Sequence, residues 1–185
     1  MFIEKRNQFT KEGRYFVILD ETGFQKDVGF KRGYSKKGVR LQIENKNLKL
    51  GKNISVLAAI NQYKLLTYSK QSTSFNRISF LEFLNKNKSL FPKKTVLVMD
   101  NASFHHSKEV NDLALQQGWD ILYTPPYSPW FSPIEGVFSI VKNHYRKHQN
   151  IEDAFQTNLN VSAFFRHSWN LNESPHRIQK MDPKK

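Results

Sequence analysis

YFVILD at residues 15–20 is an unbroken apolar run that ends in a carboxylate, and TVLVMD at residues 95–100 repeats that pattern. Runs of this length, rich in aromatic and β-branched residues, are typical of strands buried on both faces of a sheet. The other expected elements are strands at 55–60 and 121–123 and helices beginning near residues 76, 107 and 134. This order predicts an α/β fold with a mixed sheet, and such sheets carry functional groups at strand ends.

The chain has 185 residues, the size of one domain, and contains no cysteine. A disulfide framework, a thiolate zinc site and a cysteine nucleophile are therefore excluded. No apolar run approaches the roughly 20 residues that span a bilayer, and residues 1–14 are too polar for a signal peptide. We expect a polar tail at 1–13, one domain at 14–172 and a polar tail at 173–185. The protein is expected to be intracellular, in the nucleus of a eukaryotic host or the cytoplasm of a bacterium.

Lysine and arginine number 29 against 16 acidic residues, which gives a formal charge of +13. A domain this basic attracts a polyanion, either nucleic acid or an anionic membrane surface. A membrane partner favours basic residues along one amphipathic helix, whereas here they are spread through turns and between strands. Nucleic acid is therefore the expected partner. The alternative is a basic balance that serves only solubility.

Three acidic residues form the most informative pattern. Asp20 and Asp100 end the two most buried strands, and Glu135 lies in the first turn of the best-defined helix. Matching strand ends bring the aspartates together, and a helix that begins after the proline-rich loop at 124–129 can bring Glu135 to the same edge. Three carboxylates repel by about 1–4 kcal/mol per pair at roughly 4 Å unless cations lie among them. Hard oxygen ligands of this kind select Mg²⁺ or Mn²⁺, and two such ions support displacement at phosphorus.

The same helix carries two basic residues. Lys142 and Arg146 lie seven and eleven positions beyond Glu135, so all three share one stripe of the helix, along which a phosphate backbone can run. Each acid also has a purely structural interpretation. Ser132 and Glu135 fit a capping box in which the glutamate bonds only backbone, and aspartates after strands commonly open turns. From spacing alone, these alternatives stay open.

Four blocks of sequence carry a resemblance to a known family. The blocks read LDETGF at 19–24, RGYS at 32–35, VMDNASFHH at 98–106, and PPYSP leading to SPIE at 125–135. In this order they resemble the signature blocks of DDE-type transposases of the mariner-like superfamily, which includes bacterial insertion-sequence relatives. Residues 101–134 separate the second acid from the third, and this gap is similar to the one in that superfamily.

The resemblance implies an RNase H-like fold, a mixed five-stranded sheet flanked by helices, for the catalytic domain at 14–172. Asp20 is placed on the first strand, Asp100 at the end of the fourth, and Glu135 on the helix after the fifth. The implied activity is metal-dependent cleavage of DNA at transposon ends and joining of the 3′-hydroxyl to target DNA, with two Mg²⁺ or Mn²⁺ ions. Family members work as dimers across paired ends, so a homodimer is one oligomeric state that the resemblance allows.

Residues expected to contact DNA are Arg32, Lys36, Lys37, Asn101, His105, Lys142 and Arg146. For His105, a local bond to backbone is an equally good interpretation. Aromatic residues among the basic ones are expected either to stack on unpaired bases or to anchor loops and core. They are Tyr34, Tyr127, Trp130 and Phe131.

Two features depart from the family pattern. Ser132 stands where the family usually has asparagine, and serine caps a helix comparably well. Met1 lies only about a dozen residues before the first strand, which leaves no room for the N-terminal helix-turn-helix region that recognises transposon ends, so we expect sequence-specific end binding to be lost. Two alternatives to an active transposase are a DNA-binding remnant with no working metal site and another RNase H-like nuclease, such as one that cleaves RNA.

Overall fold

The computed structural model describes residues 1–25, 34–40 and 53–170, and it contains the predicted mixed sheet of five strands. The strands are β1 (Tyr15–Phe24), β2 (Ile54–Ile60), β3 (Leu65–Gln71), β4 (Thr95–Met99) and β5 (Asp120–Tyr123). They lie in the order β3-β2-β1-β4-β5. The first three strands pair antiparallel, while β4 runs parallel to both β1 and β5. The carboxyl ends of β1, β4 and β5 therefore point toward the same side of the molecule.

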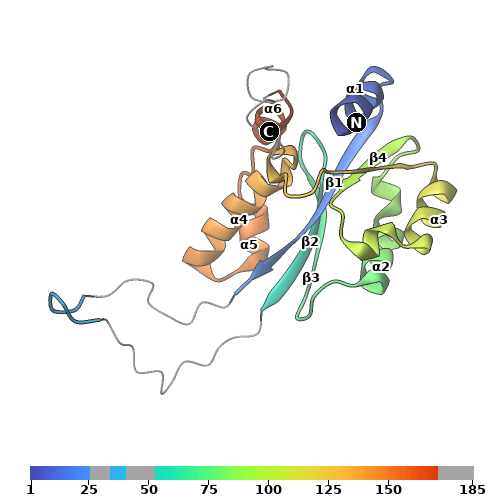
Figure 1. Cartoon of the computed structure of the whole chain (residues 1–185). Coiled ribbons are helices and arrows are strands. Elements are labelled where there is room, and N and C mark those ends of the chain that lie inside the picture. Colours follow the sequence, from blue (N-terminus) through green and yellow to red (C-terminus); the bar gives the residue numbers. More distant parts are fainter. Residues whose placement is uncertain (26–33, 41–52, 171–185) are drawn as a thin grey trace.

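Helices cover both faces of the sheet (Figure 1). One face is covered by α1 (Phe2–Lys11), α4 (Ile134–His148), α5 (Ile151–Gln156) and α6 (Val161–Asn170), and the other by α2 (Arg77–Asn87) and α3 (Lys108–Gln117). Short 3₁₀ turns η1 (Lys88–Leu90), η2 (Ser103–His106) and η3 (Pro129–Phe131) lie between these elements. In the described part of the chain, no helix combines the length and apolarity needed to cross a bilayer.

The predicted helices follow their sequence signals closely. Asn76 caps α2 by accepting a hydrogen bond from the Ser79 backbone N–H at 3.0 Å. Gly118 ends α3 in the left-handed conformation, with φ of 70°. The residues that α4 buries are the ones its 3.6-residue apolar period selects, namely Ile134, Val137, Phe138, Val141 and Tyr145. Period and caps therefore predicted these elements correctly.

Strand β1 is longer than predicted. The expectation that it ends at Asp20 is wrong, because the strand continues to Phe24. Its parallel pairing with β4 ends at Ile18, opposite Val98, but its antiparallel pairing with β2 continues to Phe24, opposite Ile54. Asp20 therefore lies where β4 leaves β1, rather than where β1 ends.

The N-terminal segment is a packed helix, so the expectation of a polar tail at 1–13 is wrong. Phe2 is buried against Phe131, with the ring centroids 5.2 Å apart. Arg6 is only 3% exposed, because its guanidinium lies 5.5 Å from the centre of the Trp169 ring and donates to the Trp169 carbonyl oxygen. A cation over an indole buries a charged residue favourably, and composition alone does not reveal this. The predicted polar tail at 173–185 lies outside the described residues.

Candidate active site

The alternation of side chains along β1 and β4 decides which groups share one face of the sheet. Phe16 and Ile18 on β1, like Val96 and Val98 on β4, belong to the core under α4. Successive strand residues point to opposite faces, so Asp20, two positions after Ile18, points toward the α4 side. Asp100 follows Val98 by two positions as well and leaves β4 on the same side. The two aspartates are thus placed together by strand pairing.

Asp100 opens the turn that follows β4. Its Oδ1 accepts a hydrogen bond from the Ala102 backbone N–H at 3.0 Å, so the turn-opening interpretation is correct for this residue. The same oxygen lies 2.8 Å from Nδ1 of His105. Among the described residues, no hydrogen bond reaches the second oxygen, Oδ2, which remains available to a ligand.

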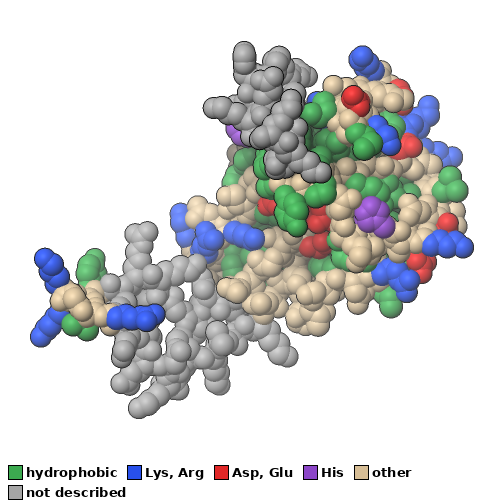
Figure 2. Space-filling model, viewed as in Figure 1, with side chains coloured by type: hydrophobic (Ala, Val, Ile, Leu, Met, Phe, Trp, Pro, Cys, Tyr) green, Lys and Arg blue, Asp and Glu red, His purple; other side chains and the backbone are tan. Residues whose placement is uncertain are grey.

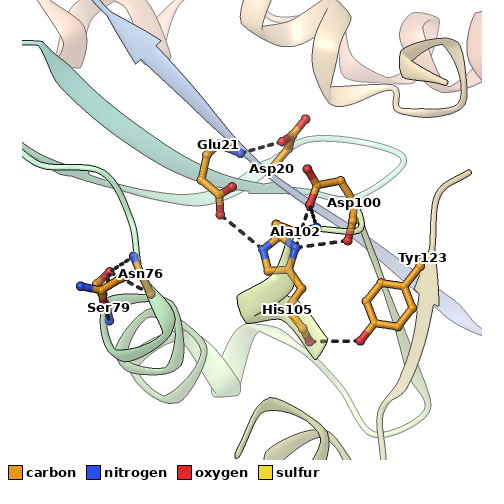
Figure 3. A network of polar contacts seen from close by, with 8 residues as sticks. All are labelled: Asp20, Glu21, Asn76, Ser79, Asp100, Ala102, His105 and Tyr123. Carbon is orange, nitrogen blue, oxygen red and sulfur yellow. Dashed lines mark hydrogen bonds and ion pairs between the residues drawn. The ribbon is translucent and has the colours of Figure 1, made fainter. Parts of the chain in front are cut away.

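His105 is held between two carboxylates (Figure 3). Its ring is 1% exposed and packs against the rings of Phe80 and Phe104, while Nδ1 faces Asp100 and Nε2 lies 3.5 Å from Oε1 of Glu21. Burial disfavours the charged imidazolium, but hydrogen bonding to Asp100 and the nearby Glu21 carboxylate outweigh it and raise the pKa of His105 to about 9. The hydrogen bond from His105 in turn lowers the pKa of Asp100. His105 therefore keeps Asp100 ionised and oriented.

Asp20 has the opposite electrostatic environment. Burial, followed by the charge of Glu135, raises the pKa of Asp20 to about 8, although its Oδ1 accepts a hydrogen bond from the Glu21 backbone N–H at 2.8 Å. Glu21 and Asp100 add further negative charge. An isolated carboxylate in such surroundings is neutral at pH 7, and a cation among these acids removes the cause of the shift.

Glu135 reaches the site from α4. Helix α4 begins without any side-chain cap, because Ser132 accepts the Glu135 backbone N–H through its carbonyl oxygen at 3.2 Å rather than through its hydroxyl. The capping-box interpretation of Glu135 is therefore wrong, and so is the expectation that Ser132 caps the helix with its side chain. The Glu135 side chain is exposed and its charge acts on Asp20.

The three acids line one cavity of about 440 Å³ together with the ends of β1 and β4 and the loop at 124–132. Within the described ranges, no three acidic or histidine side chains are close enough to hold one ion together. The three acids nevertheless fit hard divalent cations, because all of their donor atoms are carboxylate oxygens. Burial and the neighbouring negative charges raise the pKa of Asp20, and a bound cation would offset that repulsion.

The family model for the DDE superfamily endonuclease matches residues 15–158, which is most of the chain and includes all three acids. The chain belongs to this family. The matched region begins at β1 and extends through α5. A search of the curated proteins found no match to this sequence.

Solved Mos1 transposase structures share the fold of this DDE domain. A pre-cleavage Mos1 transpososome has a TM-score of 0.74 at 15% identity, covering 100% of this chain and 61% of that one. The Mos1 mariner paired-end complex with Mn has a TM-score of 0.67 at 17% identity, covering 93% and 57%. The Mos1 mariner catalytic domain has a TM-score of 0.60 at 14% identity, covering 93% and 89%. The RNase H-like fold is thus confirmed, and the chain spans less than two thirds of the first two transposase chains.

The DDE domain separates the predicted DNA-contacting residues into distinct places. Lys142 and Arg146 line a second cavity of about 290 Å³ at the far end of α4, beside Phe24. Figure 2 shows Lys and Arg side chains gathered over this part of α4, beside the acidic side chains at the centre of the face. Lys36 and Lys37 are exposed in a turn that Figure 1 shows apart from the sheet. Arg32 lies outside the described residues.

Asn101 and His105 hold the backbone and side chains around the site in place. The Asn101 side-chain N–H donates to the Thr124 carbonyl oxygen at 2.5 Å, which ties the end of β4 to the loop after β5. Both nitrogens of the buried His105 ring face carboxylates, and the side chain is only 1% exposed. The interpretation that His105 also bonds backbone is borne out, since Nδ1 lies 3.2 Å from the Asp100 carbonyl oxygen.

Sequence reasoning missed Glu21 as a member of the site. Glu21 follows Asp20 on β1 and so points to the opposite face of the sheet, the face that α2 and α3 cover. There its carboxylate lies close to the His105 ring. The sequence contained a signal for this role. Glu21 directly follows Asp20, and histidines at 105 and 106 follow the strand that leads to Asp100. Only the strand alternation shows that it supports Asp100 through His105 rather than joining the three acids.

Proposed function

We propose that this DDE domain is a divalent-metal-dependent polynucleotidyl transferase that cleaves DNA and joins the new 3′-hydroxyl to a second DNA. The observation that carries the proposal is one cavity lined by Asp20, Asp100 and Glu135, with the pKa of Asp20 raised to about 8 by burial and neighbouring acids. Membership of the DDE endonuclease family and the likeness to Mos1 complexes with transposon ends support the choice of DNA.

Each residue has a separate task in this proposal. Asp100 presents Oδ2 toward the cavity while His105 and the Ala102 N–H hold Oδ1. Asp20 presents its carboxylate to the same cavity from the middle of the sheet, and Glu135 presents a third carboxylate from α4. Two Mg²⁺ or Mn²⁺ ions, when bound, activate a water or a 3′-hydroxyl and stabilise the leaving oxygen during in-line displacement at phosphorus. Residues Lys142 and Arg146 bind the DNA backbone beyond the cleaved phosphate.

Thermal unfolding in EDTA, Mg²⁺ and Mn²⁺ tests the metal site directly. An ion that binds only the folded state stabilises it by RT ln(1 + [L]/Kd), about 2.7 kcal/mol at 100 times Kd, or roughly 5–10 °C in Tm for a domain of this size. We expect this rise in the parent and its loss in Asp100→Asn. Asp112→Asn, an exposed acid on α3, is the matched control and should keep the rise.

DNA assays then separate the proposed function from its two alternatives. A nicking and strand-joining assay on duplex DNA should show activity in Mg²⁺ or Mn²⁺ that Asp100→Asn lacks. Binding of DNA without any metal response or cleavage would indicate the non-catalytic remnant. Cleavage of an RNA–DNA hybrid in preference to duplex DNA would indicate the other RNase H-like nuclease.

A further inference from the structure

Tyr127 is an exposed aromatic residue at the mouth of the carboxylate cavity. Its side chain is 97% exposed, it lines the cavity that holds the three acids, and no other ring contacts it in the described residues. Burial is the usual contribution of a tyrosine to folding. Tyr127 makes no such contribution, so its position needs another explanation.

The backbone at Tyr127 is strained as well. Its φ is 54°, in the left-handed region that is unfavourable for residues with a side chain. The other described non-glycine residues with positive φ are Lys94, Gln149 and Asn160. Gln149 ends a helix, where this conformation is usual. Strain in a bulky residue beside a site is commonly maintained by function.

The loop that carries Tyr127 is held firmly at both ends. The Thr124 backbone N–H donates to the Met99 carbonyl oxygen at 2.9 Å, and the Asn101 side chain holds the Thr124 carbonyl. On the other side, the Trp169 indole N–H donates to the Phe131 carbonyl oxygen at 3.3 Å. Prolines at 125, 126 and 129 restrict the loop between these anchors. The ring is thus presented by a rigid support rather than by a loose loop.

We infer that Tyr127 is a stacking platform for an unpaired base of the DNA strand whose phosphate lies at the three acids. This inference rests on the proposed function, because the acids bring a phosphodiester next to the ring. Every base has a π face, so stacking on a tyrosine is independent of sequence. The role of Tyr127 is to position the nucleotide, and it takes no part in metal binding.

Fluorescence of 2-aminopurine tests the inference. The probe is a DNA duplex with 2-aminopurine as an unpaired 3′-terminal base, bound in Mg²⁺ and read before cleavage products accumulate. We expect the parent to quench the probe, Tyr127→Ala to bind without quenching and about 5- to 150-fold more weakly, and Tyr127→Phe to behave as the parent. Tyr63→Ala, at a tyrosine 69% exposed in the β2–β3 turn, is the control and should change neither value.

A stability measurement separates this role from a structural one. Tyr127→Gly should raise Tm by about 2–4 °C, because glycine adopts positive φ without strain, while it abolishes quenching. A residue that serves only the fold would lower Tm when replaced. Unchanged quenching and affinity in Tyr127→Ala overturns the inference while leaving the proposed function intact. Absence of any DNA binding by the parent overturns both.

Discussion

Two kinds of support hold the three acids of this DDE domain. Asp20 and Asp100 are placed by backbone pairing, since the β1–β4 register sets Ile18 opposite Val98 and each acid follows two residues later. Glu135 is placed by side-chain packing alone, through the buried face of α4. Strand pairing is set by hydrogen bonds between backbone groups, which form whatever the side chain is, whereas packing depends on the shape of each side chain. The strand-held pair should therefore tolerate changes in the surrounding core that displace the helix-held acid.

The packing that holds α4 is tight next to Glu135. A Cβ atom on Gly136 would lie 2.3 Å from Cδ1 of the Phe164 ring, which comes from α6. Helix α6 in turn reaches α1 through Arg6 and Trp169. The position of Glu135 thus depends on packing against α6 and, through α6, on α1, while the backbone register of β1 and β4 places Asp20 and Asp100.

Replacing the acids with amides should give the largest effects. Asp20→Asn, Asp100→Asn and Glu135→Gln should each lower DNA cleavage by about 100-fold or more, since loss of an outer-shell partner alone costs 10- to 100-fold. Cleavage rates in Mg²⁺ and Mn²⁺ measure this. If Glu135→Gln keeps the parent's cleavage rate, the helix-held acid is not needed for cleavage, and the comparison with the two strand-held aspartates no longer concerns one active site.

Metal-free stability should distinguish Asp20 from Glu135. The pKa of Asp20 rises from 3.8 to about 8 in the folded state, so the folded protein binds a proton that the unfolded chain releases, and stability falls as pH rises between those values. His105, with its pKa raised to about 9, also loses its contribution as pH rises from about 6.5. Asp20→Asn removes the first effect.

In EDTA at pH 8, Asp20→Asn should be more stable than the parent by on the order of a few kcal/mol, measured by urea denaturation. Glu135→Gln should give a smaller gain, because Glu135 is exposed and acts only through its charge on Asp20. Equal pH dependence of unfolding in the parent and in Asp20→Asn would show that Asp20 keeps an ordinary pKa.

Gly136→Ala tests the packing of the helix-held acid. In an open helix this change stabilises, but here the Phe164 ring must move, so we expect a loss of about 1–3 kcal/mol and a lower Tm. Calorimetry of the parent, the variant and the Phe164→Ala background checks this. With the ring removed, Gly136→Ala should become neutral or stabilising; a loss that persists would place the strain elsewhere.

The smallest effect is expected at the far end of α4. Lys142→Gln and Arg146→Gln should each lower the slope of log DNA affinity against log salt by about 1, with the metal-induced rise in Tm unchanged. Lys93→Gln, exposed before β4 at the opposite end from Asp100, is the control. An unchanged slope in both α4 variants would exclude this stripe from the DNA path.

The sequence predicted local structure well because local structure has a period. The runs at 15–20 and 95–100 specify buried strands, and the apolar residues of α4 recur at 3.6 residues per turn. The order of these elements was enough to predict a mixed sheet, and the motif blocks were enough to predict the family. The prediction from sequence failed at residues 1–13, where a mostly polar segment forms a helix because Phe2 and Arg6 contact residues far away in the chain.

By itself, then, the sequence determined which two buried strands bring Asp20 and Asp100, which face of α4 is buried, and to which family the chain belongs. Tertiary structure alone decided that His105 lies between Glu21 and Asp100, that Ser132 does not cap α4, that Phe164 fills the space at Gly136, and that Tyr127 is presented in a strained conformation. Periodicity records the environment of a residue along its own element. Contacts between elements depend on sheet register and side-chain packing, and neither is written at any one position in the chain.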